Sequence, residues 1–263
     1  MYPWKYWRES RNVLIFAAAL LTLLVILVAQ AEIKIAHSNR MHFNTADFSQ
    51  FGAFFVAALY VQSAVLAFVA WLMGGVGIGR NLGEECGSYV LTRPRRRSWF
   101  LWHDWVCGMA EIAVIVAVTN LVIWQLAHYI MMRFHDPLQG RVAFHGGAGE
   151  YLLATLMGLI FLCVMIFCGT IFSVTYFSTI VLKHARGVVL GAGLLAGYVA
   201  LGMVVKHYWP SVELPHLIPT PFAFDHHHFQ GLSDSFGFSI AAHALAMLAF
   251  PVAAQFVLER ADI

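Results

Sequence analysis

Histidine is the most frequent of the residues in this sequence that could perform chemistry. Most of the 13 histidines fall between apolar stretches or at one end of them: His37, His42, His128, His135, His145, His207, His216, His226, His227 and His228. Imidazole is the commonest metal ligand and titrates near neutral pH, so such a group could capture a metal ion or sense pH. Adjacent histidines do not have the spacing of a formed site, and no cysteine or carboxylate pattern completes one. A metal site at His226, His227 and His228 therefore stays an alternative, not the main expectation.

Acidic and amide side chains also lie inside one apolar stretch. Asp104, Glu111 and Gln125 follow one another at intervals of seven and fourteen residues, which keeps them near one face of a helix. A carboxylate at membrane depth is costly and usually faces the interior of a bundle, a polar cavity or a partner. The three residues could line a translocation path. Alternatively, Glu111 is a carboxylate near the membrane interface, either neutral or paired with an arginine.

Motifs of known enzymes are missing from the sequence. The stretch GGVGIGRN at Gly74–Asn81 resembles a phosphate loop, but Arg80 and Asn81 stand where a nucleotide-binding loop needs Lys and Ser or Thr. No HExxH motif and no nucleophile elbow occurs. Haem ligation needs facing histidines inside membrane spans, and His243 is the one histidine well within a span. We therefore expect no catalytic site and no nucleotide-binding motif in this chain.

The composition is that of a helical membrane protein. Of the 263 residues 60% are hydrophobic and 11% are charged, and the mean hydropathy is +0.71. A soluble domain is about half apolar and about one quarter charged. Because a membrane-spanning helix takes roughly 20 apolar residues, the sequence predicts a single all-α membrane domain over residues 1–263. Its six predicted spans are Val13–Ala29, Phe51–Val76, Trp105–Met131, Tyr151–Thr175, Val188–Val205 and Phe236–Leu258.

Basic residues predict the orientation of these spans. One side of the predicted membrane collects Lys5, Arg8, Arg11, Arg80, Arg93, Arg95, Arg96, Arg97, Lys183, Arg186 and Arg260, and the other has Lys34, Arg40, Arg133, Arg141 and Lys206. The richer side is cytoplasmic by the positive-inside rule, so both termini and the loop 79–98 are predicted to be inside. The predicted location is the inner (plasma) membrane. The four cysteines avoid the predicted outer loops, so we expect no structural disulfide.

Three further segments carry predictions. In residues 1–12, Trp4 and Trp7 alternate with basic residues, which suits an interfacial elbow helix or an ordinary aromatic and basic anchor. The outer segment 206–235 is predicted to pack as short helices or turns over the outer end of a pathway. Its histidines His226, His227 and His228 would adjust that packing with pH or a bound metal. The pairs Gly187/Gly191 and Gly193/Gly197 have the small-residue spacing that lets helices approach closely.

The loop between the second and third predicted spans is unusually rich in charge. Residues 80–92 can form a helix about 20 Å long, which Pro94 ends. Glu84 and Glu85 lie near the start of that helix, where its dipole favours acids. Tyr89, Val90 and Leu91 offer an apolar edge to a partner. The arginines that follow can hold the segment against anionic lipid: Arg93, Arg95, Arg96 and Arg97.

The same loop resembles the cytoplasmic loop between helices two and three of ABC-2-type transporter permeases. That family has a glutamate before a short helix with a Gly-Thr pair and a leucine-rich end, followed by a Pro-x-x-Arg turn. The matching residues here are, in order, Glu84 or Glu85, Gly87-Ser88, Val90-Leu91 and Pro94-Arg95-Arg96-Arg97. Ser88 stands for the usual Thr, and Asp104 lies where the family commonly has Lys. The match covers about a tenth of the chain.

The resemblance implies a permease that has no catalytic residues of its own. It assigns Glu84, Glu85, Gly87, Ser88, Tyr89, Val90 and Leu91 to a coupling helix that docks on a separate ATPase. It implies two ATPase subunits, which bind ATP and magnesium, and a second permease copy or a homologous permease, but no nucleic acid. The expected function is the membrane subunit of an ABC transporter, acting as an exporter. The alternatives are a membrane protein that handles a metal or cofactor through its outer histidines, and a structural subunit of a larger membrane complex.

Overall fold

The structure is a computed structural model that describes residues 2–38, 61–76, 97–134, 147–182, 185–208, 222–225, 228–232 and 236–260. This part of the chain is helical except for one short hairpin. Its elements, in chain order, are α1 (Tyr2–Ser38), a short helix (Val61–Gly74), α5 (Arg97–Phe134), α6 (Gly147–Leu182), α7 (Ala185–Tyr208), β1 (Phe222–Asp225), β2 (His228–Leu232) and α8 (Phe236–Arg260).

Five helices of the described part are long and apolar enough to cross a membrane, which agrees with the predicted class of polytopic helical membrane protein. Their apolar windows are Ser10–Leu27, Ser98–Gln125, Gly158–Leu182, Arg186–Val205 and Phe236–Arg260. They correspond to the first, third, fourth, fifth and sixth predicted spans. The second predicted span, Phe51–Val76, is described as a helix over Val61–Gly74, and residues 51–60 lie outside the described part.

Four helices begin earlier than their predicted spans, and the difference is largest for α1 and α5. The third span is predicted to begin at Trp105, whereas α5 begins at Arg97, three residues after Pro94, because proline ends a preceding helix but does not hinder one that follows it. Helix α1 runs without a break from Tyr2 to Ser38, which at 1.5 Å per residue is about 56 Å. Residues 2–12 are therefore the first three turns of α1 and do not form a helix of their own.

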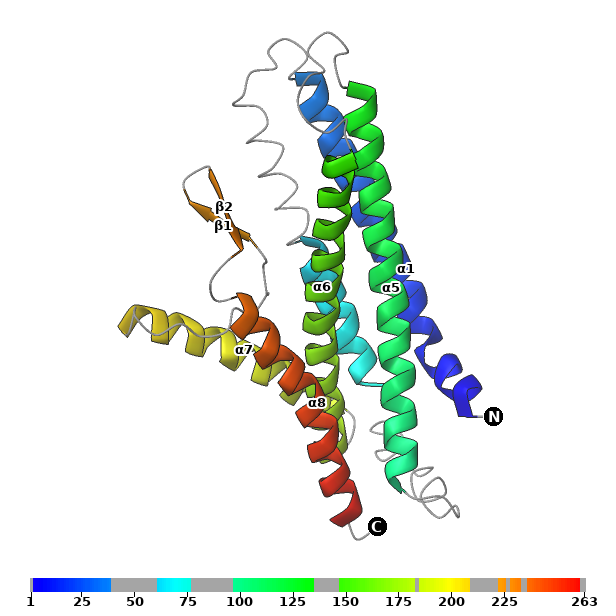
Figure 1. Ribbon diagram of the computed structural model, residues 1–263. Coiled ribbons are helices and arrows are strands. Elements are labelled where there is room, and N and C mark those ends of the chain that lie inside the picture. The colour runs from blue at the N-terminus through cyan, green and yellow to red at the C-terminus, as the bar shows by residue number, and fades with distance from the viewer. Residues whose placement is uncertain are drawn as a thin grey trace.

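The helices form a bundle with one divergent member. In Figure 1, α1, α5 and α6 run side by side, and α8 lies along α6, with which it has extensive contact. Helix α7 follows α6 directly but leaves the bundle at a steep angle (Figure 1). The start of α1 and the end of α8 lie toward the same end of the bundle. The end of the short helix and the start of α5, which flank residues 77–96, also lie toward that end, and we call it the loop end.

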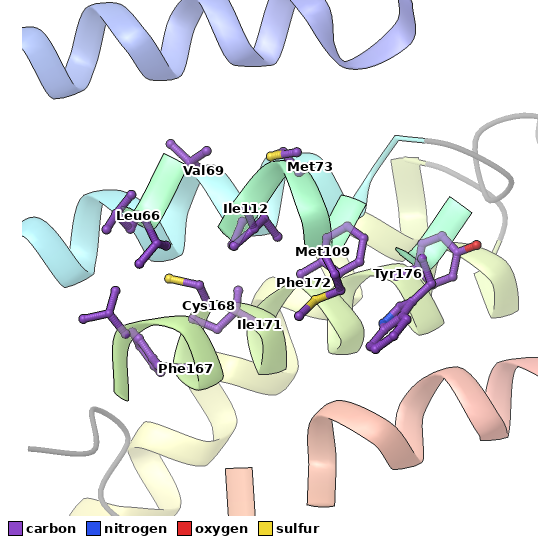
Figure 2. Packing of buried hydrophobic residues seen from close by; sticks show 14 of the residues in the cluster. Leu66, Val69, Met73, Met109, Ile112, Phe167, Cys168, Ile171, Phe172 and Tyr176 are labelled. Atoms are coloured by element: carbon purple, nitrogen blue, oxygen red, sulfur yellow. The ribbon is translucent and has the colours of Figure 1, made fainter. Parts of the chain in front are cut away.

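The core of the bundle is centred on α6. Of the residues in the window Gly158–Leu182, 72% are buried, against 39% in the window of α5 and 6% in that of α7. Figure 2 shows the packing: side chains of the short helix, such as Leu66 and Met73, face Ile112 of α5 and Phe172 of α6. The residue numbers rise along the short helix and fall along α5 in the same direction of the view, so these two helices are antiparallel.

The segment after α7 differs from the prediction of short helices or turns over residues 206–235. Strands β1 and β2 form an antiparallel hairpin in which Phe222 pairs with Leu232 and Asp225 pairs with His228. The alternation of phenylalanine with other residues in FAFD favours a strand, because side chains on a strand point to opposite faces in turn. An irregularity between Ala223 and Phe224 interrupts the ladder. Residues 209–221 and 233–235 lie outside the described part.

Candidate functional site at the loop end of the bundle

The predicted coupling residues are not among the described ones. Residues 83–91 and the arginines Arg93, Arg95 and Arg96 fall in the range 77–96, and Arg97 is the first residue of α5. The coupling helix therefore stays a prediction. Both flanks of the segment are described, however, and their contacts identify what the segment is attached to.

Both flanks meet a short run of hydroxyl side chains on α6, which we call the hydroxyl segment (Ser173–Thr179). Ser173, Thr175, Tyr176, Ser178 and Thr179 all have 0% of their surface exposed. Buried hydroxyl groups in an apolar helix need partners, because an unpaired one costs free energy comparable to a lost hydrogen bond. Ser178 donates to the carbonyl of Val174 one turn earlier, at 2.8 Å. Most of the other hydroxyls reach neighbouring helices.

Hydrogen bonds donated by aromatic side chains hold the first turns of α5 to α6 and α8. Tyr176 donates its hydroxyl to the backbone carbonyl of Leu101 at 3.1 Å. Trp105 Nε1 donates to Ser173 Oγ at 3.0 Å, and this bond is buried. Trp102 Nε1 donates to Gln255 Oε1 of α8 at 2.9 Å. The segment 77–96 therefore continues into a helix start that is fixed on two neighbours.

The end of the short helix is fastened to the same part of α6 by close packing. A Cβ atom added to Gly74 would lie 2.7 Å from Cβ of Thr175 and 2.9 Å from the carbonyl oxygen of Phe172, so only glycine fits there. Thr179 Oγ1 lies 2.8 Å from the carbonyl of Tyr176 and 3.3 Å from that of Gly74. Both flanks of the segment 77–96 are thus held on the same two turns of α6.

The start of α7 packs against the hydroxyl segment from another side. A Cβ atom on Gly187 would collide with Cα of Thr179 and the carbonyl of Ser178, and one on Gly191 would lie 3.0 Å from Thr175 Oγ1. The tight packing predicted for the pair Gly187/Gly191 is therefore confirmed. Added Cβ atoms on Gly193 and Gly197 would meet no described atom within 4 Å, so tight packing of that second pair is not seen within this chain.

The short helix also contacts α7 directly. Trp71 Nε1 donates to the backbone carbonyl of Val188 at 3.1 Å. A Cβ atom on Gly75 would lie 2.8 Å from Cγ2 of Val188. The end of the short helix, the hydroxyl segment and the first turns of α7 therefore make one closely packed junction.

The predicted polar face of α5 is not uniformly buried. Asp104 is 2% exposed, Glu111 is half-buried and Gln125 is exposed. Ser10 of α1, itself 0% exposed, donates its hydroxyl to Glu111 Oε1 at 3.1 Å. The second oxygen, Glu111 Oε2, is buried and has no hydrogen-bond partner in the described part of the chain. Glu111 thus links α1 to α5, and a place for the three residues on a translocation path stays a prediction.

Two buried amides escaped the sequence reasoning. Gln62 of the short helix is 0% exposed, and neither polar atom of its side chain has a partner among the described residues. Asn120 of α5 is 6% exposed; its Nδ2 donates to the carbonyl of Val116 at 2.9 Å, while its Oδ1 has no such partner. A signal existed in the sequence, because Gln62 interrupts a predicted apolar span.

The histidines of the described part do not form a metal centre. Among the described residues, no three His, Cys, Asp or Glu side chains come close enough together to hold a metal ion. His243 is 7% exposed, and its Nδ1 lies 2.8 Å from the carbonyl of Ser239. Its own carbonyl accepts a hydrogen bond from Thr170 Oγ1 at 2.9 Å, so His243 takes part in the packing of α8 on α6. His226 and His227 lie outside the described residues, so a metal site there stays untested.

Comparisons of the chain with known protein families, with curated proteins and with solved structures found no match. The resemblance to ABC-2-type permeases therefore rests on the loop sequence. The structure adds apolar helices of membrane-spanning length and the attachment of both flanks of that loop.

Proposed function

We propose that this chain is the membrane subunit of an ABC exporter, powered by ATP that a separate ATPase hydrolyses. The observation that carries the proposal is the attachment of both flanks of residues 77–96 to the hydroxyl segment of α6. A segment that passes a movement from a partner to the membrane helices must be in close contact with at least one of those helices.

The composition of the loop supports the same proposal. Glu84 and Glu85 precede an apolar edge, and four arginines follow it. A positively charged anchor would explain the arginines, but it would not explain the paired glutamates or the apolar residues before them. Docking on an ATPase explains both, because the acidic and apolar side chains form the contact while the arginines hold the membrane side.

Tryptophans near this end of the bundle support a location at a membrane surface. Trp71, Trp99, Trp102 and Trp105 all lie on the turns that flank residues 77–96. Tryptophan is enriched at both membrane–water interfaces. The loop between these turns is then on the water side of the interface, where a soluble ATPase can reach it.

The proposal is tested by purifying the full chain in mild detergent and identifying co-purifying proteins by mass spectrometry. We expect an ATPase with a phosphate-binding loop. The variant Glu84→Lys/Glu85→Lys reverses the charge at the contact, and Leu91→Asp buries an unpaired carboxylate there. Each variant should lower ATPase recovery at least tenfold. A tenfold loss of affinity corresponds to about 1.4 kcal/mol of binding free energy, and an unpaired buried charge costs several kcal/mol.

The matched control is Arg95→Gln, which changes charge in the same loop but on the side assigned to lipid. It should leave ATPase recovery close to that of the unchanged protein. Recovery of no ATPase with the unchanged protein, or full recovery with the Lys and Asp variants, would contradict the proposal.

A further inference from the structure

Four buried polar side chains interrupt the apolar faces of the short helix and α5. Gln62 and Ser63 of the short helix are 0% and 3% exposed, and Thr119 and Asn120 of α5 are 4% and 6% exposed. We call these four residues the polar layer. Thr119 donates its hydroxyl to the carbonyl of Ile115 in its own helix at 2.7 Å, so this hydroxyl has a partner. The two amides of the layer are less well satisfied.

The two amides lie at similar heights in the bundle. Gln62 is twelve residues from Gly74, and Asn120 is fifteen residues from Trp105, and both Gly74 and Trp105 contact the hydroxyl segment of α6. At 1.5 Å per residue these separations are about 18 Å and about 22 Å. In Figure 2 the short helix and α5 are antiparallel, and Leu66 lies in the core that they share. The amides therefore belong to one level of one core.

Three polar atoms of the layer have no hydrogen-bond partner among the described residues. They are Oε1 and Nε2 of Gln62 and Oδ1 of Asn120. The remaining amide group, Asn120 Nδ2, donates to the carbonyl of Val116 at 2.9 Å. An unpaired buried amide costs free energy, and in a membrane span no lipid can replace the lost partner. Native proteins satisfy such atoms with a ligand, and ordered water is the usual one.

The composition of this level selects an uncharged ligand. The described residues 61–76 and 112–125 contain no charged side chain, and Glu111 is nine residues, or about 13 Å, from Asn120 along α5. An ion would therefore lack a counter-charge on these two helices. The unpartnered atoms are two acceptors and one amide donor. Water donates two hydrogen bonds and accepts two, so it matches this set.

We propose that the polar layer binds ordered water inside the membrane-spanning part of the bundle, where the water donates to Gln62 Oε1 and Asn120 Oδ1 and accepts from Gln62 Nε2. A buried water makes about three hydrogen bonds to otherwise unsatisfied groups, which is the number of unpartnered atoms here. The inference goes beyond the proposed function, because it holds whatever the chain transports.

The test is radiolytic footprinting of the full chain in lipid nanodiscs. A short X-ray pulse converts water into hydroxyl radicals, which oxidise side chains next to that water, and mass spectrometry locates the products. Leu66 and Ile123, each 2% exposed, lie about one turn from Gln62 and Asn120 and serve as reporters. Met73 is 0% exposed and serves as the internal control, because methionine reacts with radicals more readily than leucine or isoleucine. We expect both reporters to be oxidised and Met73 to stay unmodified.

The variant Gln62→Met/Asn120→Leu replaces both amides by apolar side chains of similar size, and it should lose most of the oxidation at both reporters. The single variant Gln62→Met should lower the oxidation of Leu66, and it serves if the double variant does not fold. The matched control is Thr119→Val, which removes a hydroxyl of the same layer that is already bonded within α5, and it should keep the oxidation. An unmodified Met73 in each variant shows that the core is intact.

Four results would overturn the inference. Unmodified reporters in the unchanged protein would show that no water is present at this level. Undiminished oxidation in the amide variants would show that the amides do not hold the water. Oxidation of Met73 together with the reporters would mean that water enters the whole core, and an equal loss in Thr119→Val would reduce the effect to general packing. None of these results depends on an ATPase, so the proposed function is tested separately.

Discussion

At the scale of single residues, two glycine pairs of α7 differ in their contacts. Gly187 and Gly191 touch the backbone and the hydroxyl segment of α6, whereas Gly193 and Gly197 face no described atom. The spacing is the same in both pairs, so the sequence predicts close approach for both. The rotation of α7 about its axis decides which pair meets α6.

We expect Gly187→Ala to destabilise the protein by about 1–3 kcal/mol, the usual cost of forcing an extra carbon into a packed contact. The new Cβ would collide with Cα of Thr179, which is backbone and cannot turn aside. Thermal unfolding in detergent measures the effect. Gly193→Ala is the matched control, because its Cβ meets open space, and its melting temperature should be unchanged or slightly higher. Equal losses in both variants would contradict the packing described here.

The hydrogen bond between Ser10 and Glu111 gives a second residue-scale prediction. Because an acceptor oxygen of Glu111 is satisfied by Ser10 at 3.1 Å, Ser10→Ala should lower the free energy of unfolding by about 0.5–2 kcal/mol. The loss should shrink when Glu111 has already been changed to Ala. The measurement is a double-mutant cycle of unfolding in mixed micelles.

The control for this cycle is Thr22→Ala, which removes a hydroxyl of α1 that bonds to its own helix at Ala18. That change should be independent of Glu111. Strict additivity of Ser10→Ala and Glu111→Ala would show that the bond contributes nothing.

At the scale of helices, the sequence predicts the existence of the spans well and their contacts poorly. Hydrophobic length alone identifies the five long spans, because the bilayer sets that length. The hydroxyl segment cannot be recognised from the sequence, because SVTYFST lies in a charge-free run and matches no motif. Its role depends on which face of α6 meets Gly74 and Leu101, and that comes from the packing of other helices. The hairpin was missed because its strands are short.

The orientation of the helices is the element-scale prediction. The excess of basic residues predicts that both termini and Ser98 face the cytoplasm, while His37 and His145 face outward. Single cysteines at these positions, in a protein without its native cysteines, are tested with a membrane-impermeant maleimide on sealed vesicles of known sidedness. Labelling of Ser98→Cys from the outside would invert the topology.

At the scale of the whole molecule, the bundle has one densely packed helix and one divergent helix. Helix α6 contacts both flanks of residues 77–96 and the start of α7. Only 6% of the apolar window of α7 is buried in the described part of the chain. This arrangement leaves apolar surface on α7 for lipid or for the second permease copy that the proposed function requires.

The most direct test of the central claim is native mass spectrometry of the complex released from nanodiscs, combined with an assay of ATP hydrolysis on the same sample. We predict a particle that contains two permease subunits, either two copies of this chain or one copy with a homologue, and two ATPase subunits. It should hydrolyse ATP in the presence of magnesium and fall apart in Glu84→Lys/Glu85→Lys. A particle that contains this chain without any ATPase, and that does not hydrolyse ATP, would contradict the account.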